Sequence, residues 1–139
     1  MGSVELPTVI GPLAFAQRHL GQRVTAPGGL GGQCVDLINV WLIEGRGQQP
    51  IHANAVDWVG VPLARHKWTP NGPVNHPPRS AIVVWGPAPE VGIGVFGHIA
   101  LCLTSDPMTL LTLDSNWGAE IVTLQIHSYH GVLGWFAPG

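Results

Sequence analysis

The sequence predicts an α+β domain, with helices near the N-terminus packed on one face of a C-terminal antiparallel sheet. Two patterns lead to this prediction. Apolar residues recur at helical spacing in the first part of the chain, and short runs with the two-residue period of strands follow from Ala81 onward. Helices that come first and antiparallel strands that come afterwards are typical of this fold class. Because 139 residues are the size of one domain, we expect residues 1–139 to form a single unit.

Three helical segments are expected before the sheet. Residues 12–20 carry apolar side chains at helical spacing, and Gly21 is a suitable end. A glycine-rich loop then leads to a second helix over 34–44, whose apolar residues extend around the cylinder and predict that it is buried. A third, shorter helix is expected over 53–60. Residues 69–80 are rich in Pro, Asn and Gly and predict a loop.

The strands are expected after this loop. Runs of β-branched residues and alternating patterns predict strands over 82–85, 97–103, 110–116 and 121–126. Residues 132–136 are expected to add a strand at the edge of the sheet.

The composition excludes several classes of function. Charged residues make up 10% of the chain and the formal net charge is −2, so no nucleic-acid partner is expected. The longest run without charges, residues 91–105, is short and contains glycines and a histidine, so no membrane insertion is expected. Residues 1–7 contain no basic region followed by an apolar run, which argues against a secretory signal. A surface with few charges is compatible with a protein that partners partly cover in an assembly.

Cys34 has the sequence context of a nucleophile. It follows the glycine-rich stretch 28–32 and Gln33, and it opens the second predicted helix. The backbone N–H groups and the dipole at a helix N-terminus stabilise an anion, so they favour a thiolate there. The alternative is a small buried hydrophobe, a common role of free cysteine and the one expected for Cys102. Two cysteines are too few for a disulfide framework, and both are expected to be free.

A cysteine nucleophile needs a base and a group that orients this base, and the predicted strands supply both. If residues 106–108 form a three-residue loop, His98 faces Asn116 on the next strand, and Asp114 lies diagonally about 7–8 Å away on the same face. A two-residue loop would instead place His98 opposite Ser115 and separate these side chains. Taken singly, the histidine is more typical of a structural residue, and the other two side chains could belong to a turn.

Five short motifs resemble, in order, those of CHAP domains, the cysteine, histidine-dependent amidohydrolases/peptidases of the papain-like superfamily. These domains are found in phage endolysins, virion-associated lysins and bacterial cell-wall hydrolases. The resemblance runs from about residue 12 to residue 136. The motifs are Gln33-Cys34-Val35-Asp36-Leu37, Asn54-Ala55-Val56-Asp57-Trp58, Ile82-Val83-Val84-Trp85, Gly97-His98-Ile99-Ala100 and Asp114-Ser115-Asn116-Trp117-Gly118.

The resemblance implies a papain-like fold and cleavage of amide bonds in peptidoglycan, by an endopeptidase or an N-acetylmuramoyl-L-alanine amidase. It implies that Cys34 is the nucleophile and His98 the base. Asp114 corresponds to an acidic residue that orients the histidine, and Asn116 to a polar residue beside this pair. The oxyanion would be held by the backbone N–H of Cys34 and a second donor, for which Gln33 and Asn116 are both candidates.

Two of the six tryptophans are expected at a substrate groove. Trp41 and Trp85 lie within apolar elements and are assigned to the core. Trp58 and Trp117 are expected to line a groove for sugar or peptide, with burial in the core as the alternative.

No metal and no cofactor are expected. Some CHAP domains bind calcium in an acidic loop before the cysteine, whereas residues 25–32 contain no carboxylate here, and Asp36 alone makes a poor site. His127 and His130 have loose metal-ligand spacing, but they lack companion cysteines or carboxylates nearby in the sequence.

The expected partner is bacterial peptidoglycan. The low charge favours an enzyme carried in the phage virion, with tail proteins as further partners, over an endolysin held in the host cytoplasm until its release to the wall. Two other functions remain open: a structural module of a phage tail that keeps the fold without the chemistry, and a papain-like amidase that acts on a different amide.

Overall fold

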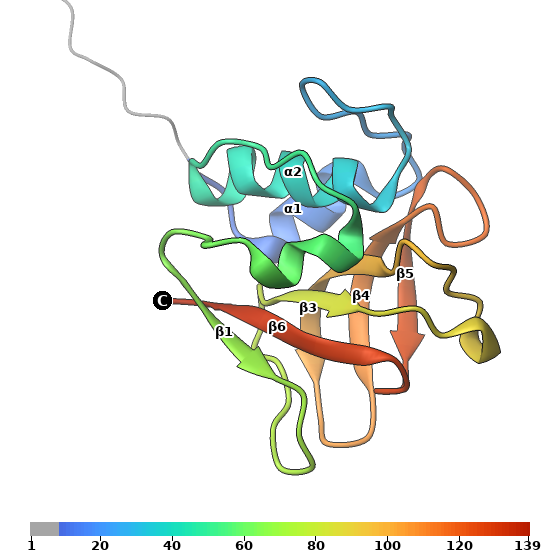
Figure 1. Cartoon of the computed structure of the whole chain (residues 1–139). Helices are drawn as coiled ribbons and strands as arrows, with labels where there is room; N and C mark the ends of the chain where they lie inside the picture. The colour runs from blue at the N-terminus through green and yellow to red at the C-terminus, as the bar shows by residue number, and fades with distance from the viewer. Residues whose placement is uncertain (1–8) are drawn as a thin grey trace, which may run out of the picture.

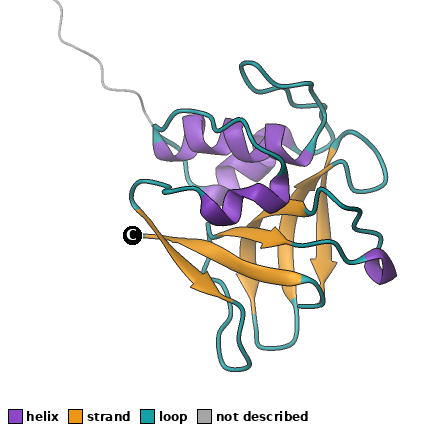
Figure 2. Ribbon diagram, in the orientation of Figure 1, coloured by secondary structure: helices purple, strands orange, loops and turns teal. Residues whose placement is uncertain are grey.

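Helices cover one side of a single sheet in the computed structural model, which describes residues 9–139 (Figures 1 and 2). The expected α+β class is confirmed. The question of a secretory signal lies outside the described residues. The elements are α1 (Pro12–His19), α2 (Cys34–Arg46), the 3₁₀ helix η1 (Ala55–Gly60), β1 (His66–Pro70), β2 (Ile82–Trp85), the short η2 (Pro89–Val91), β3 (His98–Ser105), β4 (Leu110–Ser115), β5 (Val122–His127) and β6 (Val132–Pro138).

The sheet contains six strands in the order β1-β6-β2-β3-β4-β5, and all neighbouring strands are antiparallel. The C-terminal strand was expected at an edge, and this is wrong, because β6 lies between β1 and β2. Strand β1 was not predicted, and its last two residues fall in the expected 69–80 loop. Its sequence, HKWTP, has no clear alternation, and its proline is tolerated because the strand lies at the edge.

The main core lies between the helices and the sheet. Leu37 and Ile38 of α2 pack with Ile99 and Leu101 of β3 in one buried cluster. These β3 residues are odd-numbered, so the side chains of even-numbered residues point to the opposite face of the sheet. The site residues of β3 therefore lie on the face away from this core.

A second buried cluster covers this opposite face. It contains Val83 and Trp85 of β2, Ala100 and Cys102 of β3, and Trp135 of β6. Cys102 is fully buried, as expected for a core residue, and neither cysteine forms a disulfide. This cluster lies on the same face of the sheet as the side chain of His98.

The β3–β4 hairpin reaches the expected register at the site by a different route. Ser105 pairs with Leu110, so the loop has four residues, 106–109, and not three. The Asp106 carboxylate accepts the backbone N–H groups of Met108 and Thr109, which stabilises this longer turn. A bulge between Cys102 and Thr104 then takes up the extra residue.

Beyond the bulge, Leu101 pairs with Leu113. Continuing that register by three residues places His98 level with Asn116 and diagonal to Asp114.

Within residues 9–139, none of the helices is long and apolar enough to cross a membrane.

Candidate active site

The loop before Cys34 is held in place by Asp36, which lies in the first turn of α2. Its buried carboxylate accepts the backbone N–H groups of Ala26 at 3.0 Å, Gly31 at 2.9 Å and Gln33 at 3.1 Å. Gly31 adopts a φ of +89°, a left-handed conformation that favours glycine. The carboxylate therefore connects the loop to the helix whose first residue is Cys34.

Cys34 is half-buried at the N-terminus of α2, and its side chain lies close enough to the imidazole of His98 to help raise the pKa of that ring. His98 begins β3 and is only 5% exposed. Its Nε2 lies 2.7 Å from Oδ2 of Asp114 on β4, whose side chain is fully buried. The imidazole therefore has the Asp114 carboxylate as its hydrogen-bond partner and the Cys34 thiol as its second polar neighbour.

The interactions among these side chains stabilise the charged forms of His98 and Asp114. Burial alone would lower the pKa of His98, but hydrogen bonds and charge interactions with Asp114 and Cys34 raise the pKa to about 9. Burial alone would raise the pKa of Asp114, but hydrogen bonds from His127 and His98 keep this pKa below its ordinary value. His98 is therefore an imidazolium and Asp114 a carboxylate at neutral pH.

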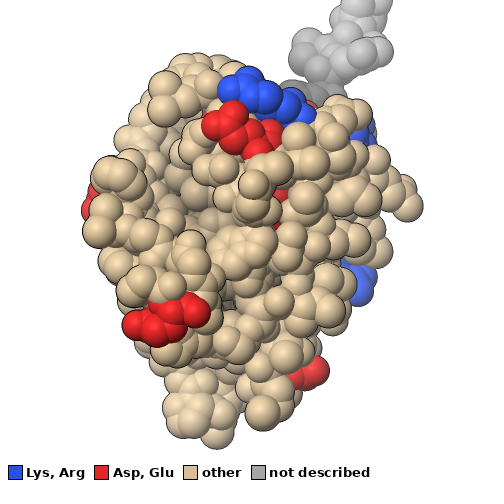
Figure 3. Space-filling view, turned by 90° about the vertical axis from the view of Figure 1, so that its right-hand side faces the viewer, with Lys and Arg blue, Asp and Glu red and all other residues tan. Residues whose placement is uncertain are grey.

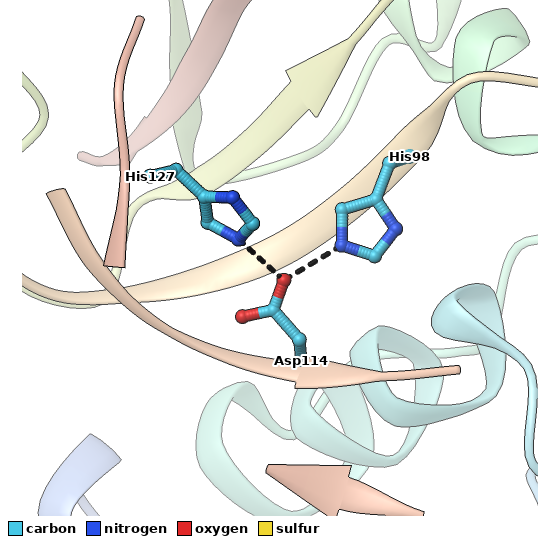
Figure 4. Close-up of side chains that lie close together, drawn as sticks. All are labelled: His98, Asp114 and His127. Carbon is cyan, nitrogen blue, oxygen red and sulfur yellow. Dashed lines mark hydrogen bonds and ion pairs between the residues drawn. The ribbon is translucent and has the colours of Figure 1, made fainter. Parts of the chain in front are cut away.

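His127, the last residue of β5, is the member of this cluster that the sequence analysis missed. Its Nε2 lies 2.9 Å from the same Oδ2 of Asp114 that contacts His98. Figure 4 shows the two imidazoles converging on one carboxylate oxygen. The strand was predicted to end at Ile126, one residue before the histidine. A strand one residue longer would have placed His127 on the face of Thr123 and Gln125, and this is the signal that was available.

His127 has no carboxylate nearby in the sequence, but Asp114 reaches it from the neighbouring strand. One ligand atom each from His98, Asp114 and His127 lies within 4.8 Å of the others. Two imidazoles and a carboxylate are possible ligands for a transition metal. The contacts of 2.7 and 2.9 Å are those of hydrogen bonds to a carboxylate.

Two indole rings flank both imidazoles. The ring centroid of Trp85 lies 5.3 Å from that of His98 and 4.9 Å from that of His127. The ring centroid of Trp117 lies 5.0 and 4.7 Å from the same two rings. Aromatic rings at these distances exclude water and stabilise an imidazolium. Trp85 was assigned to the core, and it also forms part of this wall.

Asn116 directly follows β4 and has a left-handed backbone conformation, with a φ of +62°. Its exposed amide donates to Oε1 of Gln33 at 3.0 Å. The Gln33 amide in turn donates to the Gly31 carbonyl at 3.3 Å and to Glu120 Oε1 at 3.1 Å. Both Gln33 N–H groups therefore have acceptors, whereas one N–H of Asn116 remains for a further acceptor.

Cys34 lines two cavities. A cavity of about 180 Å³ is lined by Cys34, Gly92, Ile93, Gly94, Gly97, His98, Asn116 and Trp117. A second cavity of about 400 Å³ is lined by Leu30, Gln33, Cys34, Val35, Asn54, Ala55, Phe96 and Gly97. Neither lining contains Lys, Arg, Asp or Glu, and Figure 3 shows only a few scattered charges on the face that it displays.

One expected substrate residue does not reach these cavities. Trp58 has 0% of its surface exposed, and its Nε1 donates to the carbonyl of Ala53 at 3.3 Å. The prediction that Trp58 lines a substrate groove is wrong, because the apolar environment of η1 places it in the core. Trp117 is half-buried and lines the smaller cavity.

Comparison with known proteins shows similarity at the level of the fold. No family model matches the chain, and no curated protein matches it. The wild-type endolysin LysIME-EF1 has a similar crystal structure, with a TM-score of 0.73 and 22% identity over 91% of this chain and 62% of that one. Ly7917 has a TM-score of 0.65 with 17% identity, over 91% of this chain and 60% of that one.

A second structure of Ly7917, with the hydrolysing product of MDP, has a TM-score of 0.63, 17% identity and the same two coverages. The chain therefore spans about three fifths of the length of these structures, and it shares the fold of their matched parts.

Proposed function

We propose that this chain is a cysteine-dependent hydrolase that cleaves amide bonds in bacterial peptidoglycan, as a CHAP domain does. The grouping of Cys34, His98 and Asp114 carries this proposal: His98 is hydrogen bonded to Asp114, and Cys34 interacts closely enough with His98 to raise its pKa. Nucleophile, base and orienting carboxylate are the three parts that thiol catalysis needs. Cys34 lines both cavities, so a substrate bound in either one can reach it.

The reaction proceeds through a thioester. His98 holds the proton of the Cys34–His98 pair as an imidazolium, and the Cys34 thiolate attacks the carbonyl carbon of the substrate amide. When the C–N bond breaks, the His98 imidazolium gives its proton to the leaving nitrogen. His98 then takes a proton from water, the hydroxide attacks the thioester, and the freed carboxylic acid leaves while the Cys34 thiol is restored.

The tetrahedral oxyanion is held by two donors. The backbone N–H of Cys34 is the first, because it has no partner within the first turn of a helix. The side chain of Asn116 is the second, since one of its N–H groups remains available beside the smaller cavity. The Gln33 amide instead orients Asn116 by accepting its other N–H.

The substrate class follows from the cavities and from the fold comparison. Their linings contain no Lys, Arg, Asp or Glu, and Leu30 and Phe96 are exposed at the larger one. They suit the neutral amide backbone of a wall peptide and the apolar faces of a sugar. The likeness to the endolysin LysIME-EF1, and to Ly7917 with the hydrolysing product of MDP, supports peptidoglycan as the substrate. Trp117 is placed to contact this substrate from the smaller cavity.

The same likeness supports a phage enzyme that acts on the wall after release from the host cytoplasm. Delivery on the virion tail, with tail proteins as partners, is the other route. In either setting the domain needs no cofactor for the thiol mechanism.

Product analysis tests the proposed function. Purified peptidoglycan is incubated with the wild-type chain and with Cys34→Ala, and the soluble fragments are identified by mass spectrometry. The wild type is expected to release fragments with new amino groups, and the fragment masses separate an amidase from an endopeptidase. If the alanine variant releases the same fragments at the same rate, or if neither protein releases any, the proposal fails.

A further inference from the structure

Asp114 receives more hydrogen bonds than an orienting carboxylate for one histidine needs. Its Oδ2 contacts Nε2 of His98 at 2.7 Å and Nε2 of His127 at 2.9 Å, and its Oδ1 accepts the hydroxyl of Thr112. His127 lies outside the five motifs on which the resemblance rests. Its contact with Asp114 therefore has to be explained from the structure of this chain.

The protonation of both imidazoles follows from the chemistry of the acceptor. An ionised carboxylate can only accept hydrogen bonds, so Nε2 of each ring must carry the hydrogen. For His98 this leaves Nδ1 for Cys34. Asp114 is fully buried, and a buried carboxylate is costly unless donors satisfy its oxygens. Two imidazoles and one hydroxyl provide these donors.

Topology explains how two histidines reach one carboxylate. Asp114 belongs to β4, which lies between β3 and β5 in the sheet. His98 approaches from β3 and His127 from β5. Trp85 and Trp117 each pack against both imidazole rings. His127 therefore restrains, from the other neighbouring strand, the same carboxylate oxygen that His98 contacts.

We infer that His127 is a positioning residue, which acts through Asp114 by holding its carboxylate ionised and oriented toward His98. This inference rests on the proposed function, in which Asp114 orients the catalytic imidazole. His127 itself does not touch Cys34 or the cavities that flank the thiol. It lines a separate cavity of about 170 Å³ behind the site, together with Trp85, Trp117 and His130.

Loss of the contact between His127 and Asp114 is expected to change the pH dependence of activity. The titratable groups around Asp114 are His98 on β3, His127 on β5 and, beyond His98, Cys34 on α2. His130, which lines the cavity behind His127, is paired with Glu90 at 2.9 Å. Because the hydrogen bond from His127 lowers the pKa of Asp114, its loss raises this pKa. The carboxylate is then protonated at a higher pH, and the acid limb of the activity profile moves to higher pH.

Two substitutions separate the donor from the shape of the ring. His127→Gln keeps an N–H group near the position of Nε2, whereas His127→Phe keeps an aromatic ring and removes the donor. His130→Gln is the matched control, since His130 is exposed and its partner is Glu90. For each protein, kcat and KM on peptidoglycan are measured against pH. The rate of Cys34 alkylation by iodoacetamide is measured over the same pH range, with the Cys34 peptide followed by mass spectrometry.

His127→Phe is expected to lower kcat by about tenfold or more, as for the loss of a hydrogen bond to a charged group, with little change in KM. Its acid limb moves to higher pH for both hydrolysis and alkylation. His127→Gln keeps the wild-type pH profile and most of the rate, and His130→Gln matches the wild type. The inference is overturned if His127→Phe keeps the wild-type rate and profile, or if His127→Gln is impaired as strongly as His127→Phe.

A measurement on the wild type needs no variant to fold. Nitrogen-15 NMR of the histidine side chains identifies which ring nitrogen carries the hydrogen. The inference requires a hydrogen on Nε2 of His127, and a neutral ring protonated only on Nδ1 overturns it. The alkylation profile also separates the two proposals. Absence of peptidoglycan hydrolysis in every protein refutes the proposed function, whereas the alkylation profiles still decide the role of His127.

Discussion

At the scale of single residues, the site depends on how one buried carboxylate controls the imidazole beside it. His98 is buried, which by itself disfavours its charged form, yet its pKa lies near 9 because Asp114 and Cys34 surround it. The positive charge on His98 is therefore stabilised by these partners and not by solvent. Changing one partner is expected to change both the rate and its pH dependence.

Asp114→Asn tests this control. Removal of the carboxylate charge lowers the pKa of His98 from about 9, so the imidazolium loses its proton at lower pH and the alkaline limb of kcat/KM moves downward. By analogy with orienting carboxylates, turnover is expected to fall by up to about 10⁴-fold. The pH profile of peptidoglycan hydrolysis measures both effects. An unchanged profile with wild-type turnover would assign the orienting role to another residue.

Asn116→Ala is expected to behave differently. Its amide faces the smaller cavity and donates to Gln33, and it does not contact His98 or Asp114 through any hydrogen bond found within residues 9–139. Loss of an oxyanion donor lowers kcat by about 10²–10³-fold. Because no titrating group is altered, the pH profile stays in place. A shifted profile at nearly normal kcat would contradict the oxyanion role.

At the scale of elements, the β3–β4 hairpin shows what sequence reasoning could and could not reach. Alternation placed His98 and Asp114 on one face, and this is confirmed. The loop length was wrong, and a bulge near Leu103 compensated for the error. Neither the Asp106 turn nor the bulge has a periodic signature, since both depend on local hydrogen bonds that the pattern of apolar residues does not encode.

Strand β1 and His127 were missed for a related reason. β1 is extended because it pairs with β6, so its structure comes from a distant partner and not from its own sequence. His127 meets Asp114 only when β5 is placed beside β4. The prediction for Trp58 is wrong for a different reason. A large aromatic side chain near a motif is equally compatible with the core and with a groove.

The loop before α2 yields a prediction about stability. Asp36→Ala removes the acceptor for three backbone N–H groups, so the free energy of unfolding is expected to fall by about 3 kcal/mol. Urea unfolding measures this loss, and the exposed Asp57→Ala serves as a control with little expected change. Equal stability of the two variants would show that the loop is held by other contacts.

The same loop predicts independence from calcium. Residues 25–32 contain no carboxylate, and the Asp36 oxygens already accept backbone hydrogen bonds. A hard cation needs several oxygen ligands, which this segment does not offer. The rate of hydrolysis and the melting temperature are expected to be the same in EDTA and in excess calcium. A reversible loss in EDTA that calcium restores would contradict this reading.

At the scale of the whole molecule, the two cysteines differ in a way that isolates the proposed nucleophile. Burial raises the pKa of Cys102 to about 12, and its side chain is closed off within the second apolar cluster. Cys34 lines two cavities and interacts with the His98 imidazolium. An alkylating reagent should therefore distinguish them in the native protein.

Titration of the native chain with iodoacetamide tests the central claim most directly. At each dose, mass spectrometry gives the modified fraction of each cysteine, and peptidoglycan release gives the remaining activity. Activity is expected to fall in proportion to modification of Cys34, while Cys102 stays unmodified. Full activity in a sample whose Cys34 is completely alkylated would contradict the claim that its thiolate is the nucleophile.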